Sequence, residues 1–207
     1  MKIHDFKGFP NPTRVRIAIA EKGLSDRIEF VPVNVPDGEH RTPAFMAKNP
    51  SAVVPVLELE DGTCIAECTA ITEYLDNLAG LPTLTGSTAR DRAMIHMMHR
   101  RAEAGLLDAL ATYFHHATPG LGPHIETYQN REWGEKNRER GLAGMRYLDG
   151  VLAKHAYLAG DRFTMADITA FAGLMYTDFA KIDIPAELTH LKAWRARVAD
   201  RPSVKAA

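Results

Sequence analysis

Residues 49–75 constrain the fold of this chain more than any other stretch. A Val54-Pro55 step opens an apolar run with a strand pattern, and Asp61-Gly62 follows it, a pair typical of tight hairpin turns. A second short strand pattern comes next, and then apolar residues recur at helical spacing. A hairpin that leads directly into a helix predicts the closing part of a small α/β domain.

The start of that helix has the chemistry of a peptide-binding site. Backbone amides at Glu67, Cys68 and Thr69 lack helical partners, so they can hold a carboxylate, and the Glu67 side chain can meet an ammonium group beside it. If the peptide bond before Pro55 is cis, the Val54 N–H and C=O turn outward and can pair with an extended peptide. A carboxylate, an ammonium group and a short backbone together describe the γ-glutamyl end and the cysteine of glutathione.

The overall composition is that of a soluble globular protein. The chain has 207 residues, of which 45% are hydrophobic and 25% charged, and a net charge of −1, which argues against a general surface for nucleic acid or anionic membranes. Its two cysteines, spaced Cys64-x-x-x-Cys68, form neither a disulfide framework nor the redox spacing Cys-x-x-Cys. No apolar run approaches the roughly 18 residues of a membrane span. We therefore expect a cytoplasmic protein without nucleic-acid or membrane partners.

The chain divides into an α/β part and an all-helical part. Helix and strand breakers are concentrated in the segment Gly80–Gly86, and no strand pattern follows it. This predicts a first domain at 1–80, a linker at 81–89 and an all-helical second domain at 90–207. In the first domain, strands are predicted at 2–6, 28–33, 56–59 and 63–66, and helices at 13–22, 44–48 and 67–78. In the second domain, capping patterns and apolar spacing predict helices at 88–116, around 142–152, at 163–176 and at 186–200.

Three further segments carry a family resemblance. They are Gly-Glu-His-Arg-Thr-Pro-Ala-Phe at 38–45, Tyr-Leu-Ala-Gly-Asp-Arg-Phe-Thr-Met-Ala-Asp-Ile at 157–168 and Arg-Pro-Ser-Val at 201–204. Together with residues 49–75, they resemble the cytosolic glutathione S-transferase superfamily, in the expected order along the chain. The resemblance implies a thioredoxin-like N-terminal domain that binds glutathione as a substrate, and an all-helical C-terminal domain that lines the site of a small electrophile. It also implies a homodimer, and the Met-rich segment Met94–Met98 suits such an interface.

The loop after the first strand departs from the usual pattern of that superfamily. Most members hold the glutathione thiolate with a Tyr, Ser or Cys there, but residues 7–16 contain none, and Phe9 stands where Ser falls in several classes. Lowering a thiol pKa by two units takes about 2.7 kcal/mol, and a hydrogen bond to a charged acceptor supplies about 1.5–3 kcal/mol. Asn11 is therefore the predicted catalytic residue, in an atypical branch. The alternatives are that Asn11 only shapes the turn, or that the Thr13 hydroxyl takes the role.

The tandem pair His115-His116 is the second catalytic candidate. In the family architecture its helix borders the active-site cleft, so an imidazole, His115 in preference, can accept the thiol proton directly or through water. The alternative is that both histidines cap the end of the helix. Phe9, Tyr113 and Phe114 are the predicted apolar wall of the electrophile pocket.

Two more residues complete the predicted glutathione site. His40 resembles the histidine that binds the glycine end of glutathione in some relatives, with a solvated loop charge as the alternative. Cys68 replaces the usual Ser, so its backbone N–H rather than its side chain is expected to bind the γ-glutamyl carboxylate. No metal is predicted, because the pair His96 and His99 has no carboxylate–histidine cluster to complete a metal site.

Three acidic residues are predicted to have no catalytic role. Glu73 and Asp76 are expected to be solvated charges on the helix at 67–78. Asp167 lies three residues after Thr164, and this spacing predicts a capping box that stabilises the helix start.

The leading functional prediction is an enzyme that conjugates the glutathione thiolate to small hydrophobic electrophiles. A glutathione-dependent peroxidase or thiol reductase on the same fold is one alternative, since an Asn-type site without a cysteine nucleophile is compatible with it. A non-enzymatic binding protein of the same fold is another, and Phe9 in place of the usual hydroxyl favours that alternative.

Overall fold

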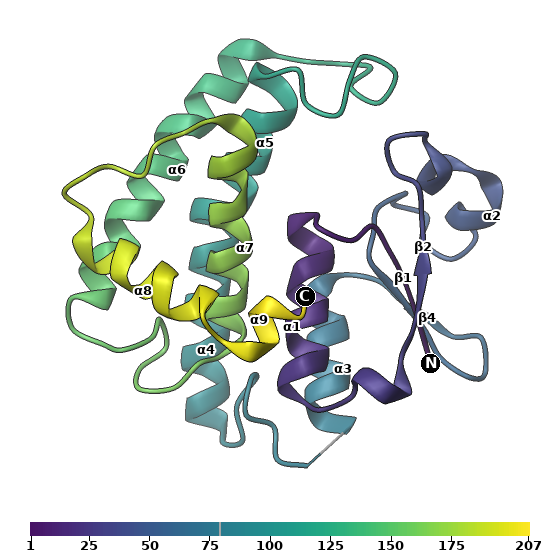
Figure 1. Cartoon of the computed structure of the whole chain (residues 1–207), viewed down its shortest axis with the longest axis horizontal. Helices are drawn as coiled ribbons and strands as arrows, with labels where there is room; N and C mark the ends of the chain where they lie inside the picture. Colours follow the sequence, from purple (N-terminus) through teal and green to yellow (C-terminus); the bar gives the residue numbers. More distant parts are fainter. Residues whose placement is uncertain (79) are drawn as a thin grey trace.

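The computed structural model of the chain describes residues 1–78 and 80–207, which form an α/β domain and a helical domain side by side (Figure 1). The first domain contains β1 (Lys2–Asp5), α1 (Pro10–Glu21), η1 (Ser25–Arg27), β2 (Glu29–Pro32), η2 (Glu39–Arg41), α2 (Pro43–Met46), β3 (Val56–Glu58), β4 (Cys64–Ile65) and α3 (Cys68–Leu78). The second contains α4 (Ala89–Ala102), the π-helical turn η3 (Glu103–Leu107), α5 (Asp108–Ala117), α6 (Arg131–Leu152), α7 (Met165–Ala180), α8 (Thr189–Ala199) and α9 (Pro202–Lys205).

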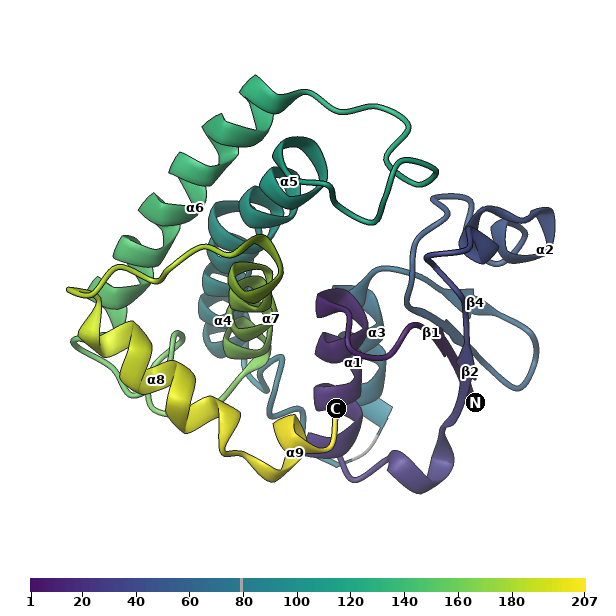
Figure 2. The ribbon, with the colours of Figure 1, turned by 45° about the horizontal axis from the view of Figure 1, so that its top comes forward.

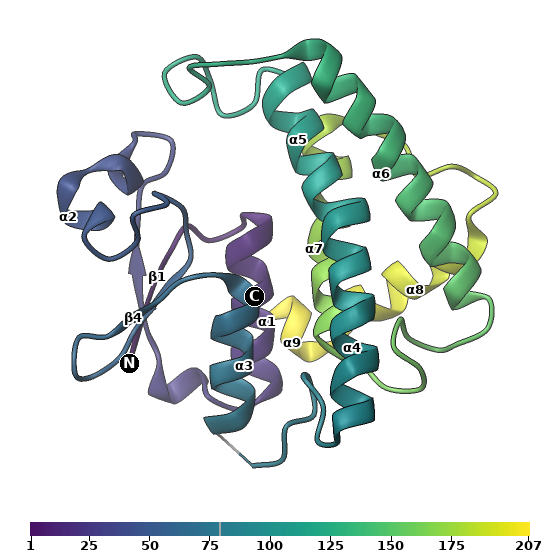
Figure 3. The ribbon, with the colours of Figure 1, turned by 180° about the vertical axis from the view of Figure 1, so that it is seen from behind.

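The first domain is built on a four-stranded sheet with the strand order β2-β1-β3-β4. β1 pairs in parallel with β2 and antiparallel with β3, and β3 pairs antiparallel with β4. Helices α1 and α3 lie between this sheet and the second domain (Figure 3). Their apolar residues and those of the sheet share one buried cluster, which includes Ile3, Leu57, Ile71 and Leu75. The order β-α-β-α-β-β-α and the thioredoxin-like fold are confirmed.

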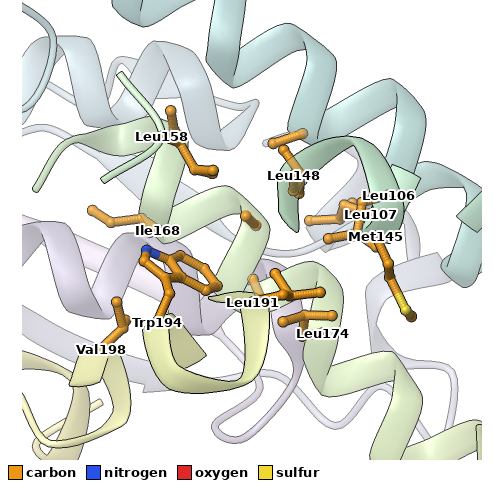
Figure 4. Packing of buried hydrophobic residues seen from close by; sticks show 14 of the residues in the cluster. Leu106, Leu107, Met145, Leu148, Leu158, Ile168, Leu174, Leu191, Trp194 and Val198 are labelled. Atoms are coloured by element: carbon orange, nitrogen blue, oxygen red, sulfur yellow. The ribbon is translucent and has the colours of Figure 1, made fainter. Parts of the chain in front are cut away.

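The second domain packs its helices around α7, which is buried along most of its length. Figure 4 shows its apolar core, where the Trp194 ring of α8 lies near Ile168 and Leu191. The predicted capping box is present, because Thr164 is the N-cap of α7 and its N–H donates to Asp167 at 3.1 Å. The all-helical second domain is therefore confirmed, and α7 also packs against α1 of the first domain.

The helix predicted at 88–116 exists but is not regular. It begins as predicted, with the Thr88 hydroxyl accepting the Asp91 N–H at 3.2 Å. The π-helical turn at Glu103–Leu107 then separates α4 from α5. Such a turn holds extra backbone within a helix and changes the angular position of every residue after it. α4 and α5 therefore form one continuous helical element, but the side chains of α5 point in other directions than they would in a regular continuation of α4.

Several predicted boundaries and environments were wrong. Helix α1 begins at Pro10, three residues early, because proline suits a first turn whose N–H groups need no partner. A further short helix, α9, follows the predicted end of the chain's last helix at Pro202. Asp76 is fully buried rather than solvated: it accepts the Thr85 N–H at 2.7 Å and pairs with Lys22 at 2.9 Å. It thereby ties the segment after α3 to the first domain.

Glu73 is also more than a solvated charge. Its carboxylate pairs with Arg92 at 3.1 Å and with His96 at 2.6 Å, both on α4. These contacts bridge the two domains along their shared edge. Within the described part of the chain, no helix is both long and apolar enough to cross a membrane.

Candidate active site

A cavity of about 370 Å³ lies where loops of the first domain face α5, α7 and the segment between α5 and α6. That segment, residues 118–130, reaches from the helical domain toward the first domain (Figure 2), and we call it the strap. Most of the predicted site residues line the cavity, which we call the cleft. Its lining includes Phe9, Asn11, His40, Val54, Phe114, His115, Leu121, Ile125, Glu126, Tyr176 and Phe179.

The amide of Asn11 has a defined orientation in the cleft. Arg14, one turn further along α1, donates from Nη1 to Asn11 Oδ1 at 3.1 Å. A guanidinium can only donate hydrogen bonds, so the atom that faces it must be the amide oxygen. The NH₂ group of Asn11 is thereby left as a donor, and within the described residues nothing accepts from it. This arrangement suits an anionic acceptor in the cleft.

Arg14 belongs to a buried polar network at the junction of the two domains. Its side chain is only 6% exposed, and its Nη2 donates to Glu103 in the π-helical turn at 3.0 Å. Burial raises the pKa of Glu103, but Arg14 and His99 outweigh that effect and hold the pKa below its usual range. His99 lies between the hydroxyls of Thr69 at 2.8 Å and Thr169 at 3.0 Å. The network therefore links α1, α3, α4 and α7.

The start of α3 lies next to Asn11. The Cys68 thiol donates to the Asn11 carbonyl oxygen at 3.4 Å, and burial raises the pKa of this thiol. The side chain of Cys68 therefore remains a protonated structural donor, while its N–H is in the first turn of α3, where no helical partner exists. Glu67 precedes it with a left-handed φ of 68°, a conformation that is costly for a residue with a Cβ atom, and its side chain is exposed.

The Val54–Pro55 peptide bond is cis, which is the condition on which the predicted pairing of Val54 with a peptide depends. Val54 lines the cleft, and among the described residues no group pairs with its backbone N–H or C=O. The preceding loop is held by Asn49, whose side chain donates to the Val53 carbonyl at 2.8 Å and accepts the Ser51 N–H at 3.1 Å. An extended peptide can therefore pair with Val54.

His40 lies in η2 and is buried rather than being a solvated loop charge. Its Nδ1 atom is the one buried side-chain nitrogen or oxygen in the described residues that has no hydrogen-bond partner. Burial, and then the charge of Arg41, lower the pKa of this imidazole, which favours its neutral form. A buried polar atom without a partner is costly, and a ligand group in the cleft would satisfy it.

The two histidines of α5 point to different places. His115 lines the cleft, and its Nδ1 lies 2.7 Å from Glu126 of the strap. His116 does not line the cleft: its Nδ1 accepts the Asn130 N–H at 3.0 Å, and its ring meets Tyr128 edge-on. Only His115 therefore lies where it can exchange a proton with a ligand.

The aromatic residues that line the cleft differ from the predicted set, because one predicted residue is absent and two others are present. Phe9 and Phe114 line the cleft as expected, but Tyr113 does not, and its ring lies near the guanidinium of Arg138 on α6. In its place α7 supplies Tyr176 and Phe179, whose rings lie 5.8 and 6.1 Å from that of Phe114. Burial raises the pKa of Tyr176 above its usual range.

Sequence reasoning missed the contributions of α7 and the strap. Tyr176 and Phe179 have helical spacing, which could have marked them as one face, but α7 is so apolar that this face has no contrast. Leu121, Ile125 and Glu126 follow no motif, and only the path of the strap brings them to the cleft. No group of three or more potential metal ligands occurs among the residues that the structure describes.

Comparison with known proteins agrees with this geometry. The family model "Glutathione S-transferase, N-terminal domain" matches residues 10–78, and "Glutathione S-transferase, C-terminal domain" matches residues 106–202. Glutathione S-transferase 2 of Saccharomyces cerevisiae is 56% identical over 205 residues, which are 99% of this chain and 88% of that protein.

Solved structures give the same result. A glutathione S-transferase domain-containing protein from Marinobacter aquaeolei VT8 is 62% identical with a TM-score of 0.97, over 99% of this chain and 100% of that one. Gtt2 from Saccharomyces cerevisiae is 56% identical with a TM-score of 0.97, over 99% of both chains. Both family models, together covering most of the chain, and the similarity to these proteins agree, and the chain belongs to the glutathione S-transferase superfamily.

Proposed function

We propose that this protein conjugates the thiolate of glutathione to small hydrophobic electrophiles, with Asn11 as the residue that stabilises the thiolate. The observation that carries the proposal is the bond from Arg14 to Asn11 Oδ1, which leaves the amide NH₂ as a donor in the cleft. One hydrogen bond to a charged acceptor supplies about 1.5–3 kcal/mol, which is the size of the required pKa shift.

Three parts of the first domain support a binding mode for glutathione. The γ-glutamyl carboxylate meets the free N–H groups at the start of α3, including that of Cys68, and Glu67 receives the ammonium group. The cysteine backbone pairs with Val54 beside Pro55. The glycine carboxylate accepts from the ring of His40, whose Nδ1 atom has no partner among the described residues.

The reaction then needs only the groups that line the cleft. The thiol proton passes to His115, directly or through water, and the sulfur becomes a thiolate that accepts from Asn11. The thiolate forms a carbon–sulfur bond with the electrophile, which either loses its leaving group or, in an addition, takes up a proton. Phe9, Phe114 and the α7 aromatics would hold the apolar part of the electrophile. The position of His116 gives it no part in these steps.

Titration of bound glutathione tests the role of Asn11. In Asn11→Ala, the thiol pKa read from the ultraviolet thiolate band should rise by about one to two units, equivalent to roughly 1.4–2.7 kcal/mol. Asn77→Ala removes an exposed amide on α3 and serves as the control. An unchanged titration in Asn11→Ala would remove Asn11 from the site. Parallel assays with a chromogenic electrophile and with a hydroperoxide separate conjugation from the peroxidase alternative, and absence of both activities would favour a binding protein.

Calorimetry tests the two ends of the glutathione site. Glu67→Ala and His40→Ala should each weaken glutathione binding by roughly 1.5–3 kcal/mol, through loss of a hydrogen bond to a charged group. His190→Ala, which changes an exposed histidine on α8 away from the cleft, is the matched control for His40→Ala. Unchanged affinity in either test variant would remove that residue from the proposed binding mode.

We also propose a homodimer, with the domains divided at 80 and a linker over 81–89. The Met-rich face of α4 supports this, since Met94 is 46% exposed although it is a large apolar side chain. Light scattering should give about twice the chain mass of 22.9 kDa. A mass near that of one chain at micromolar concentration would contradict the dimer.

A further inference from the structure

The strap is fixed to both domains around the cleft. On the first-domain side, Arg41 Nη2 donates to the Ile125 carbonyl at 2.8 Å, and the His124 ring contacts the Pro36 carbonyl. On the second-domain side, Gln129 donates to the carbonyl oxygen of His115 in α5 at 2.7 Å, and within the strap it donates to that of Thr118, also at 2.7 Å. The strap therefore has a defined position over the cleft.

The carboxylate of Glu126, in the strap, is fixed by several contacts. Glu126 Oε1 accepts the Leu121 N–H at 2.9 Å and lies 2.7 Å from His115 Nδ1. Gly120, with a left-handed φ of 55°, makes room for it, because a Cβ atom at that position would overlap the Glu126 carboxylate. The Glu126 side chain is only 10% exposed. Among the described residues that line the cleft, it is the one carboxylate.

These contacts determine which nitrogen of His115 carries the proton. Oε1 already accepts from the Leu121 N–H and, as a carboxylate oxygen, has no proton to donate. The hydrogen bond at 2.7 Å must therefore run from Nδ1–H of His115 to Glu126. In a neutral imidazole this leaves Nε2 without a proton, and no described group pairs with Nε2.

We propose that Glu126 is a positioning residue that holds His115 as the Nδ1–H tautomer, so that Nε2 is free to take the proton of the glutathione thiol. The inference rests on the proposed function, in which His115 is the proton acceptor. A carboxylate behind an imidazole also stabilises the imidazolium that forms when the proton arrives. The proton moves from sulfur to Nε2, directly or through one water, and no proton passes to Glu126.

The other charged or titratable groups on the cleft cannot replace Glu126. His40 and Arg41 of the first domain are both donors toward a ligand or the strap, and the guanidinium of Arg41 contacts Ile125. Tyr176 of α7 is held neutral by burial. Asn11 faces Arg14 through its oxygen and offers only N–H groups to the cleft. Glu126 is left as the acceptor that can fix the His115 ring.

A double-mutant cycle distinguishes a role of Glu126 in positioning His115 from a role in stabilising the strap. The variants are Glu126→Ala, His115→Ala and the double variant, and the measured quantity is the thiolate fraction of bound glutathione at neutral pH. If Glu126 acts through His115, Glu126→Ala should lower the ratio of thiolate to thiol about tenfold, equivalent to about one pKa unit. In the His115→Ala background it should then change nothing more. Equal losses in both backgrounds would overturn the proposal.

Two glycine variants test the contact between Glu126 and His115 without changing a charge. Gly120→Ala should displace the Glu126 carboxylate and reproduce the loss of thiolate. Gly122→Ala is the matched control, because Gly122 also has a left-handed φ, of 99°, but its Cβ atom would meet only the His124 ring at 3.6 Å. Equal behaviour of the two glycine variants would contradict a specific role of the carboxylate.

Nitrogen NMR of isotope-labelled histidine detects the tautomer of His115 and needs no activity measurement. His115 should show a protonated Nδ1 and an unprotonated Nε2 in the free protein, and Glu126→Ala should lose this preference. Glu126→Gln should largely keep it, because the amide oxygen can still accept from Leu121 and His115. A protonated Nε2 in the unmutated protein would overturn the inference. If instead the tautomer is as expected but His115→Ala leaves the thiolate unchanged, Glu126 holds the ring and the proposed proton acceptor is wrong.

Discussion

The core of the second domain contains a fully buried carboxylate, that of Asp167, and the junction between the domains contains a partly buried one, that of Glu103, with different partners. Asp167 accepts from neutral N–H groups of Leu158 and Trp194, both at 3.0 Å and both in its own domain, and burial raises its pKa to about 6. Glu103 pairs with the cation of Arg14 across the junction, and its pKa is held low. The core acid connects parts of one domain, whereas the junction acid holds Arg14, which contacts Asn11 in the cleft. We therefore expect stability and chemistry to depend on separate carboxylates.

The strongest test of this separation is Asp167→Ala. It should destabilise the protein by about 3–5 kcal/mol, because the buried N–H groups of Leu158, Thr164 and Trp194 all lose their acceptor at once. Denaturant unfolding measures the loss, with exposed Asp161→Ala as the control. The thiolate titration of the folded fraction should stay as in the unmutated protein. A shifted titration would show that the core acid also serves the chemistry.

Lowering the pH should destabilise the junction between the domains and stabilise the core of the second domain. Burial lowers the pKa of His99 to about 4 from an ordinary 6.5, so unfolding takes up a proton and the junction loses stability as pH falls from about 6.5 to 4. Arg14, Arg100 and His96 favour this lowering, and Glu103 opposes it. We expect His99→Gln to remove roughly 1–3 kcal/mol of this pH dependence.

The raised pKa of Asp167 gives the reverse trend. Its contribution is complete below the ordinary value of 3.8 and declines as pH rises through about 6. Unfolding free energies of the unmutated protein, His99→Gln and Asp167→Asn, measured from pH 4 to 7, should therefore give difference curves of opposite slope. Difference curves of the same slope would contradict the opposite pH dependences expected for the core and the junction.

A smaller effect is expected from Arg14→Lys. Lysine keeps the charge beside Glu103 but lacks the planar fork that contacts Asn11 and Glu103 together. The amide of Asn11 would lose its fixed orientation, and the pKa of the bound thiol should rise by about one unit, or 1.4 kcal/mol. Arg16→Lys, in the same helix but paired with Asp5, is the control. A larger loss of stability than of thiolate would mean that Arg14 is mainly structural.

The smallest effect should follow Arg92→Ala, at the outer edge of the junction. Its side chain is 41% exposed and pairs with Glu73. Exposed ion pairs contribute about 0–1 kcal/mol, and salt screens them. We expect a change in unfolding free energy of less than about 1 kcal/mol, smaller still at high salt, and no change in the thiolate titration. A change above that size would make the edge of the junction as important as its buried centre.

Local signals explain why much of the fold could be predicted from the sequence. The hairpin at Asp61-Gly62, the N-cap at Thr88 and the capping box at Thr164 and Asp167 each involve residues within a few positions of one another. The predicted first-domain site residues do not follow this rule, because Asn11, Val54 and Glu67 lie in separate segments of the chain. Their association was predicted from the family resemblance.

The missed features all depend on how loops return to a helix or how one helix is oriented, and not on a pattern within one element. Asp76 was misjudged because the backbone that surrounds it, around Thr85, returns to it only in the folded chain. Glu126 reaches His115 only through the path of the strap. Tyr113 and Phe114 are neighbours, yet which of them faces the cleft depends on the angular position of α5. No pattern within one helix contains that information.

The π-helical turn at Glu103–Leu107 sets that angle. A regular helix advances about 100° with each residue, so one extra residue rotates everything after it by roughly that amount. Deleting a single residue from this turn would let α4 and α5 join as one straight helix, and it would swing His115 and Phe114 away from the cleft. A change in chain length at this turn therefore acts as a rotation, and it would remove the α5 side of the cleft without altering any side chain that lines it.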